Sequence, residues 1–165
     1  AAYPTAVTPE QCACWSYPQK EGDKEEVIFN MVNSMLVRIH QSGHLAQLSE
    51  TRKQYVKEGI KYYKKMREDI PQSLPFWPLG LPKLSDKWVS LGLRKDIKSY
   101  LAVWRLEGNN TCFLPLPKYK NKDLKVKCAY PEDGESDYEW QTKAGILSVK
   151  LPSTNCARIF EIEQV

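Results

Sequence analysis

The change in fold type lies at the stretch Leu74–Pro82, which has the sequence LPFWPLGLP. Proline fixes φ and keeps the preceding residue out of the α region, so three prolines in nine residues exclude a helix here. The residues before this stretch have helical periodicity, whereas those after it alternate as short strands do. Phe76 and Trp77 hold a large apolar area. We therefore expect a stiff connector that packs between two units.

The segment before the connector predicts two amphipathic helices. The first begins at Asp23, and Glu26 stands three residues later at capping-box spacing. Its apolar residues recur every three or four positions from Val27 to Ile39, and Gly43 is its expected end. A helix of this kind has to bury its apolar stripe against another layer.

The second helix is predicted to begin at Ser49, a good cap, and to stop at Pro71. Its outer faces are rich in Lys, Arg, Glu and Gln. Each helix has an apolar stripe that must pack against another layer. This half of the chain supplies neither a sheet nor a third helix, so the two helices alone could not bury both stripes. We expect strands outside this chain to cover them.

His40 and His44 are four residues apart, which is the spacing of two metal ligands on one face of a helix. Gly43 lies between them, and no third ligand follows at a recognisable distance. A pair of polar histidines at a helix end is therefore the favoured interpretation, and no metal is predicted.

Past the connector the sequence predicts short strands separated by turn residues. The clearest one alternates apolar and basic residues from Leu124 to Tyr130. The predicted strands are Trp88–Leu93, Tyr100–Leu106, Cys112–Leu116, Leu124–Tyr130, Tyr138–Gln141, Ile146–Leu151 and Cys156–Ile162. Strands at this spacing are typical of an antiparallel sandwich.

Composition and charge limit the kinds of molecule that the chain is expected to bind. The net charge of +4 is dispersed, and the basic stretch Lys118–Lys127 has Tyr119 as its single aromatic residue, too few to stack successive bases, so no nucleic acid is expected. No apolar run approaches the roughly 20 residues that cross a bilayer, so no membrane is expected. Five cysteines without a CxxC pair indicate reduced thiols in the cytoplasm and no zinc site.

The sequence offers no catalytic constellation. Asp137 and Glu139 lie beside an acidic turn and are interpreted as a solvated strand edge. Glu10 stands alone, although both routes of glycoside hydrolysis need two carboxylates. There is no phosphate-binding glycine loop, and no cofactor is expected.

Several stretches together resemble the carboxyl-terminal part of glycoside hydrolase family 36, the melibiase-type α-galactosidases. The matching stretches are PEQCACWSYP at 9–18, MLVR at 35–38, SGHL at 42–45, YK at 63–64, PFWPLGLP at 75–82 and YLAVWR at 100–105. This resemblance spans nearly the whole chain. It implies a retaining hydrolase of terminal α-galactosyl residues with an aspartate nucleophile and an aspartate acid/base, both in barrel motifs absent from this chain.

The resemblance implies an α+β chain in three parts. Residues 1–75 would be the last strand–helix units of a (β/α)₈ barrel, residues 76–83 a connector, and residues 84–165 a terminal antiparallel β-sandwich domain. The implied partners are an α-galactoside sugar and the missing amino-terminal portion of the same enzyme, with a homo-oligomer left open.

In such barrels the loops at the carboxyl ends of the strands line the pocket. The expected substrate-binding residues come from the aromatic loop and are Glu10, Gln11, Cys12, Cys14 and Trp15. Trp15 would stack on a sugar face, and the choice between the two cysteines as the sugar-facing one stays open. None of the five is expected to be catalytic.

A second interpretation is a non-catalytic carbohydrate-binding or scaffold module. In that case Trp88, Trp104 and Trp140 would form a stacking surface on the β half. Aromatic residues that alternate along strands belong more often to a core, which favours the first interpretation.

Overall fold

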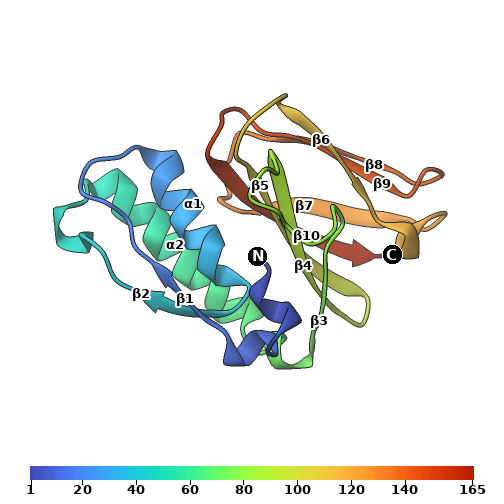
Figure 1. Cartoon of the computed structure of the whole chain (residues 1–165), viewed down its shortest axis with the longest axis horizontal. Helices are drawn as coiled ribbons and strands as arrows, with labels where there is room; N and C mark the ends of the chain where they lie inside the picture. Colours follow the sequence, from blue (N-terminus) through green and yellow to red (C-terminus); the bar gives the residue numbers. More distant parts are fainter.

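Two helices before the connector pack against one face of a β-sandwich (Figure 1). The structure is a computed structural model that describes all residues, 1–165. Its helices cover the face of a five-stranded sheet that points away from a three-stranded sheet. No helix is both long and apolar enough to span a bilayer.

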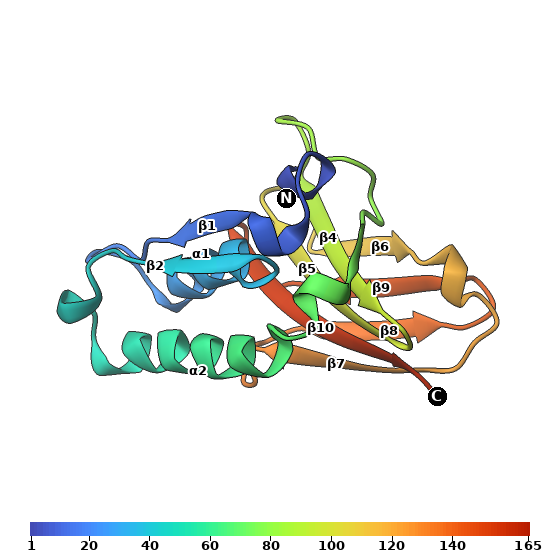
Figure 2. The same cartoon turned by 90° about the horizontal axis from the view of Figure 1, so that it is seen from below.

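Two strands and two helices alternate along the first part of the chain. β1 (Ala13–Ser16) is followed by α1 (Lys24–Met35), β2 (Arg38–Gln41) and α2 (Glu50–Met66). β1 and β2 pair in parallel as a two-stranded sheet beside the helices (Figure 2). Parallel strands need a crossover connection, and α1 provides it.

The predicted starts of both helices are confirmed. The Asp23 carboxylate accepts a hydrogen bond from the backbone N–H of Glu26 at 2.9 Å. The Ser49 hydroxyl accepts one from the N–H of Arg52 at 3.3 Å. Each cap satisfies a backbone donor that the first helical turn leaves without a partner.

The predicted ends of both helices are wrong. α1 ends at Met35, and His40 lies in β2, so His40 and His44 do not share a helical face. Residues 36–39 suit a strand as well as a helix, and pairing with β1 decides between the two. α2 ends at Met66, before the predicted stop at Pro71, and a short 3₁₀ turn, Ile70–Gln72, follows.

All seven predicted strands are present, in two antiparallel sheets. The five-stranded sheet has the order β3-β4-β5-β10-β7 and the three-stranded sheet the order β6-β9-β8. Their bounds are β3 (Leu74–Phe76), β4 (Trp88–Lys95), β5 (Lys98–Arg105), β6 (Thr111–Pro115), β7 (Leu124–Tyr130), β8 (Asp137–Gln141), β9 (Ile146–Lys150) and β10 (Cys156–Gln164).

The start of the proline-rich stretch is itself a strand, which the sequence did not predict. β3 pairs with β4 at the edge of the five-stranded sheet, where a proline is tolerated because its missing N–H faces outward. Phe76 packs against the core of the sandwich, and Trp77 packs against the core under the helices. Its two aromatic residues thus contact the two cores, whereas Leu74, Leu79 and Leu81 are exposed, and the role of the whole stretch as a connector between two units stays a prediction.

Alternate residues of the five-stranded sheet belong to two different cores. On β5, Ala102 and Trp104 pack under the helices, whereas Leu101 and Val103 face the three-stranded sheet. The apolar face of α1 is fully buried in the first of these cores. The expectation that strands outside the chain cover the helical stripes is therefore wrong, because the chain's own sheet covers them.

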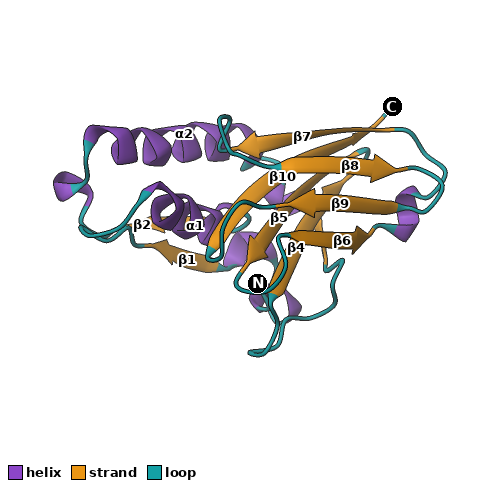
Figure 3. Cartoon of the chain, turned by 90° about the horizontal axis from the view of Figure 1, so that it is seen from above, coloured by secondary structure: helices purple, strands orange, loops and turns teal.

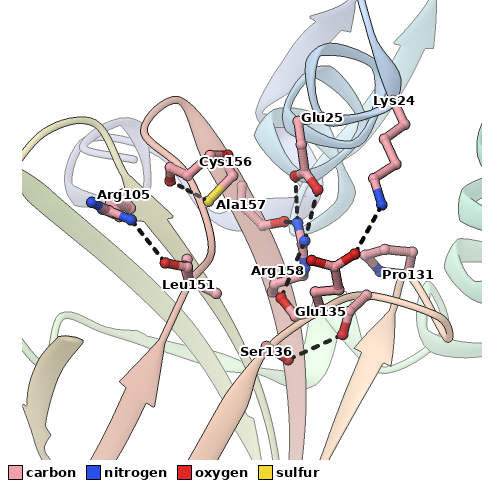
Figure 4. Close-up of polar contacts among 12 residues, drawn as sticks. Lys24, Glu25, Arg105, Pro131, Glu135, Ser136, Leu151, Cys156, Ala157 and Arg158 are labelled. Carbon is pink, nitrogen blue, oxygen red and sulfur yellow. Dashed lines mark hydrogen bonds and ion pairs between the residues drawn. The ribbon is translucent and has the colours of Figure 1, made fainter. Parts of the chain in front are cut away.

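A buried ion pair joins the helical part to the sandwich (Figure 4). The Arg158 guanidinium on β10 is fully buried and donates two hydrogen bonds to the Glu25 carboxylate of α1, at 2.7 and 2.8 Å. It also donates to the carbonyl of Glu135 at 3.4 Å. A bidentate arginine–carboxylate pair fixes orientation as well as distance.

Candidate functional site

The exposed face of the β1–β2 pair holds the most conspicuous polar and aromatic side chains of the first part. Successive strand residues point to opposite faces, so Ser16 turns toward α1, where its buried hydroxyl meets the Met31 sulfur at 3.2 Å. Trp15 and His40 turn the other way and are exposed. They are register partners on the two strands.

Trp15 and His40 form an edge-to-face pair. Their ring centroids are 5.6 Å apart and their planes cross at 83°. Trp15 is 63% exposed, so its indole ring is accessible to a ligand. An indole face can stack on the apolar face of a sugar, and an imidazole can exchange hydrogen bonds with its hydroxyls.

The loops that follow β1 and β2 are held side by side. The Ser42 N–H donates to the Ser16 carbonyl at 2.9 Å, and the His44 N–H donates to the Pro18 carbonyl at 3.0 Å. Gly43 has φ +88, and a Cβ there would lie 2.6 Å from the Pro18 carbonyl oxygen. Only glycine permits this approach, so the glycine predicted as a helix stop instead joins two loops.

A second aromatic–imidazole pair lies at the carboxyl end of the strands. Tyr17 and His44 have ring centroids 5.9 Å apart, and the His44 Nδ1 accepts a hydrogen bond from the Lys20 N–H at 3.2 Å. The carboxyl ends of parallel strands are where α/β folds bind ligands. Both pairs lie toward that end of β1 and β2, and together they are called the strip. Sequence reasoning did not pair either histidine with an aromatic residue, because it placed them on a helix.

Three predicted site residues lie at the opposite end of β1. Glu10 and Gln11 belong to a 3₁₀ turn that precedes β1, beside an open groove of about 610 Å³ between residues 4–11 and 71–75. The Glu10 carboxylate accepts a hydrogen bond from the Thr8 hydroxyl. Cys12 is buried, and burial raises the pKa of its thiol.

Cys14 lines a different pocket. This space of about 310 Å³ is mostly apolar and also contacts Tyr3, Asn33 and Trp104. Burial raises the pKa of the Cys14 thiol, so the thiolate that a nucleophile requires is disfavoured. The five predicted residues are thus spread over three places, and only Trp15 lies in the strip of aromatic and histidine residues.

The three tryptophans of the alternative interpretation do not form a shared surface. Trp104 is 4% exposed and donates its indole N–H to the Asn33 side chain at 2.8 Å, under the helices. Trp88 and Trp140 pack against the sandwich core, on different sheets. No group of three or more His, Cys, Asp or Glu residues is placed to hold a metal ion.

The fold has solved counterparts, although no family model and no curated protein matches the chain. A variant of the GH36 α-galactosidase AgaA from Geobacillus stearothermophilus, in complex with stachyose, is 12% identical with a TM-score of 0.63. The match covers 96% of this chain and 22% of that one. The galactosidase domain of the α-galactosidase–sucrose kinase AgaSK is 18% identical, with a TM-score of 0.62 over 82% of this chain and 19% of that one.

Other glycosyl hydrolases share the arrangement. An Anoxybacillus α-amylase is 10% identical with a TM-score of 0.59, over 84% of this chain and 32% of that one. The chain spans about a fifth of the length of the α-galactosidases that it matches. Its mixed fold of two helices and antiparallel sheets is shared with GH36 α-galactosidases and is consistent with a carboxyl-terminal portion of such an enzyme.

Proposed function

We propose that this chain is the carboxyl-terminal part of a retaining α-galactosidase of glycoside hydrolase family 36. Residues 1–75 would supply the last two strand–helix units of a (β/α)₈ barrel, residues 76–83 the connector, and residues 84–165 the terminal β domain. The two catalytic aspartates would come from the preceding portion of the enzyme. The chain alone would be inactive.

The incomplete parallel sheet is the observation that favours this proposal. β1 and β2 form a sheet of only two strands, so both outer edges are without a neighbour and one face is exposed. Parallel sheets are almost always covered on both faces and larger than this. Because α1 already packs on one face of the pair, further barrel strands would extend from the free edges, and the exposed face would point into the barrel.

The substrate contact would come from the exposed strip. We retain Trp15 from the five predicted residues and add His40, because both lie on the face that would point into the barrel. Glu10, Gln11 and Cys12 precede β1, at the end where barrels place stabilising rather than ligand-binding residues. The proposed ligand is an α-galactoside; solved AgaA structures contain raffinose and stachyose.

The setting of the chain is also part of the proposal. All five cysteines are free, and three of them are buried. Unpaired thiols are typical of a reducing compartment, so we infer a cytoplasmic enzyme.

The reading frame upstream of Ala1 tests the proposal. We expect it to continue for several hundred residues, about four times the length of this chain, because the chain matches about a fifth of the solved α-galactosidases. It should encode two aspartates at the ends of predicted barrel strands. A frame that starts within a few residues of Ala1 would refute the proposal and leave a scaffold module as the better account.

A further inference from the structure

A pocket of about 300 Å³ with a mixed polar and apolar lining lies between the end of α2 and the five-stranded sheet. α2 ends beside β7 at this point (Figure 3). The pocket includes no residue of β1 or β2, so it is separate from the Trp15–His40 pair. The polar side chains that line it include Tyr62, Lys65, Lys98, Lys127, Glu132 and Glu161.

Glu161 is the most buried carboxylate of this pocket. Its side chain is 16% exposed and accepts hydrogen bonds from the Tyr62 hydroxyl at 3.2 Å and the Lys127 ammonium at 3.1 Å. Burial, reinforced by Glu161, raises the pKa of Tyr62, so its hydroxyl stays a donor. A carboxylate accepts about four hydrogen bonds, which leaves Glu161 with capacity for a ligand.

Further charged side chains around the pocket have no protein partner, and Lys65 and Glu132 are exposed to solvent. Lys65 and Lys98 line it, and neither has an acidic group within ion-pair distance. The Glu132 backbone N–H donates to Glu58 at 2.7 Å, while the Glu132 carboxylate accepts no hydrogen bond. Two ammonium groups and one carboxylate are thus available at the rim.

The mixture of charges at the pocket favours a ligand without net charge. An inorganic anion would lie against Glu132 and Glu161, and a cation would lie against Lys65, Lys98 and Lys127. A neutral polyhydroxylated ligand avoids both penalties, because each hydroxyl can donate to a carboxylate and accept from an ammonium group. The volume is at the lower end of the range of about 300–1,000 Å³ for small-molecule sites.

We propose that this pocket binds one sugar residue of an oligosaccharide, as a second carbohydrate site separate from the Trp15–His40 pair. It does not depend on the proposed hydrolase function. A scaffold module would use the same pocket.

Backbone amide shifts of the ¹⁵N-labelled chain test this site during titration with methyl α-D-galactoside, methyl α-D-glucoside and methyl α-D-mannoside. We expect saturable shifts with at least one sugar at the amides of Tyr62, Lys98 and Cys128. Lys98→Ala should weaken that binding about 10-fold or more, because a charge-assisted hydrogen bond is lost. Lys143→Ala removes the same charge from an exposed turn and should leave affinity unchanged.

Trp15→Ala separates the two sugar sites, since it should abolish any shifts along β1 and β2 and leave those at the pocket intact. Absence of saturable pocket shifts with all three sugars would overturn the inference. Equal affinities in wild type and Lys98→Ala would also overturn it, as would shifts at the same amides with inorganic phosphate alone.

Discussion

Replacing Glu25 by Gln should destabilise the fold strongly, because it leaves the Arg158 guanidinium buried without its counter-charge. The side chain of Arg158 has no exposed surface, and that of Glu25 is 12% exposed. Removing one partner of a buried ion pair costs about 3–5 kcal/mol. For a chain of this size, a loss of 3 kcal/mol lowers the melting temperature by about 6–12 °C.

The measurement is urea unfolding followed by circular dichroism, with Lys24→Gln as the matched control. Lys24 is the preceding residue of the same helical turn, and its pair with Glu135 at 3.5 Å is exposed, with side chains 46% and 74% accessible. The control should change the free energy of unfolding by less than about 0.5 kcal/mol. Equal losses for the two single variants would refute the account of how the helical part and the sandwich are joined.

A double replacement distinguishes a lost attraction from an uncompensated charge. Glu25→Met combined with Arg158→Met exchanges the ion pair for apolar side chains of similar length. Such exchanges are often neutral or stabilising, so the double variant should be more stable than Glu25→Gln. A double variant that is as unstable as Glu25→Gln would mean that the geometry of the pair, rather than its charge, holds α1 against β10.

Three further outcomes are expected. Gly92→Ala should lower the free energy of unfolding by about 1–3 kcal/mol in urea, because a Cβ there would lie 2.2 Å from the Phe76 ring; an unchanged midpoint would contradict this packing. Burial and the hydrogen bond to Asp133 raise the pKa of Tyr55 to about 12, so its contribution to stability is full below pH 10 and is lost as the pH rises toward 12. Tyr55→Phe should flatten the fall in urea midpoint over that interval, and an identical fall in both proteins would count against it. Trp15→Ala should leave the melting temperature within about 2 °C, because the side chain is 63% exposed, and a large drop would place Trp15 in the core.

Local sequence signals predicted much of this fold. Asp23 and Ser49 are caps whose backbone partners are fixed by spacing alone, and the alternation from Leu124 to Tyr130 matches β7 at both ends. These features depend on residues close in the chain. The resemblance to GH36 enzymes likewise rested on short local motifs and agrees with the solved structures of the same fold.

Features that depend on distant residues were not predictable. Arg38–Gln41 became a strand because β1 is available to pair with it, and Leu74–Phe76 became a strand because β4 has a free edge. The apolar stripe of α1 indicated that this face of the helix is buried, but not which surface buries it. The Trp15–His40 pair was not predicted for the same reason, since the two side chains become neighbours only once β1 and β2 are in register.

Release of nitrophenol from p-nitrophenyl α-D-galactopyranoside tests the central claim most directly, measured for this chain alone and after co-expression with the segment encoded upstream. We predict no turnover by the chain alone and turnover by the two segments together, with a raised KM when His40→Ala is introduced. Turnover by the chain alone, lost on removal of its own carboxylates, would contradict the claim that the catalytic groups lie outside residues 1–165.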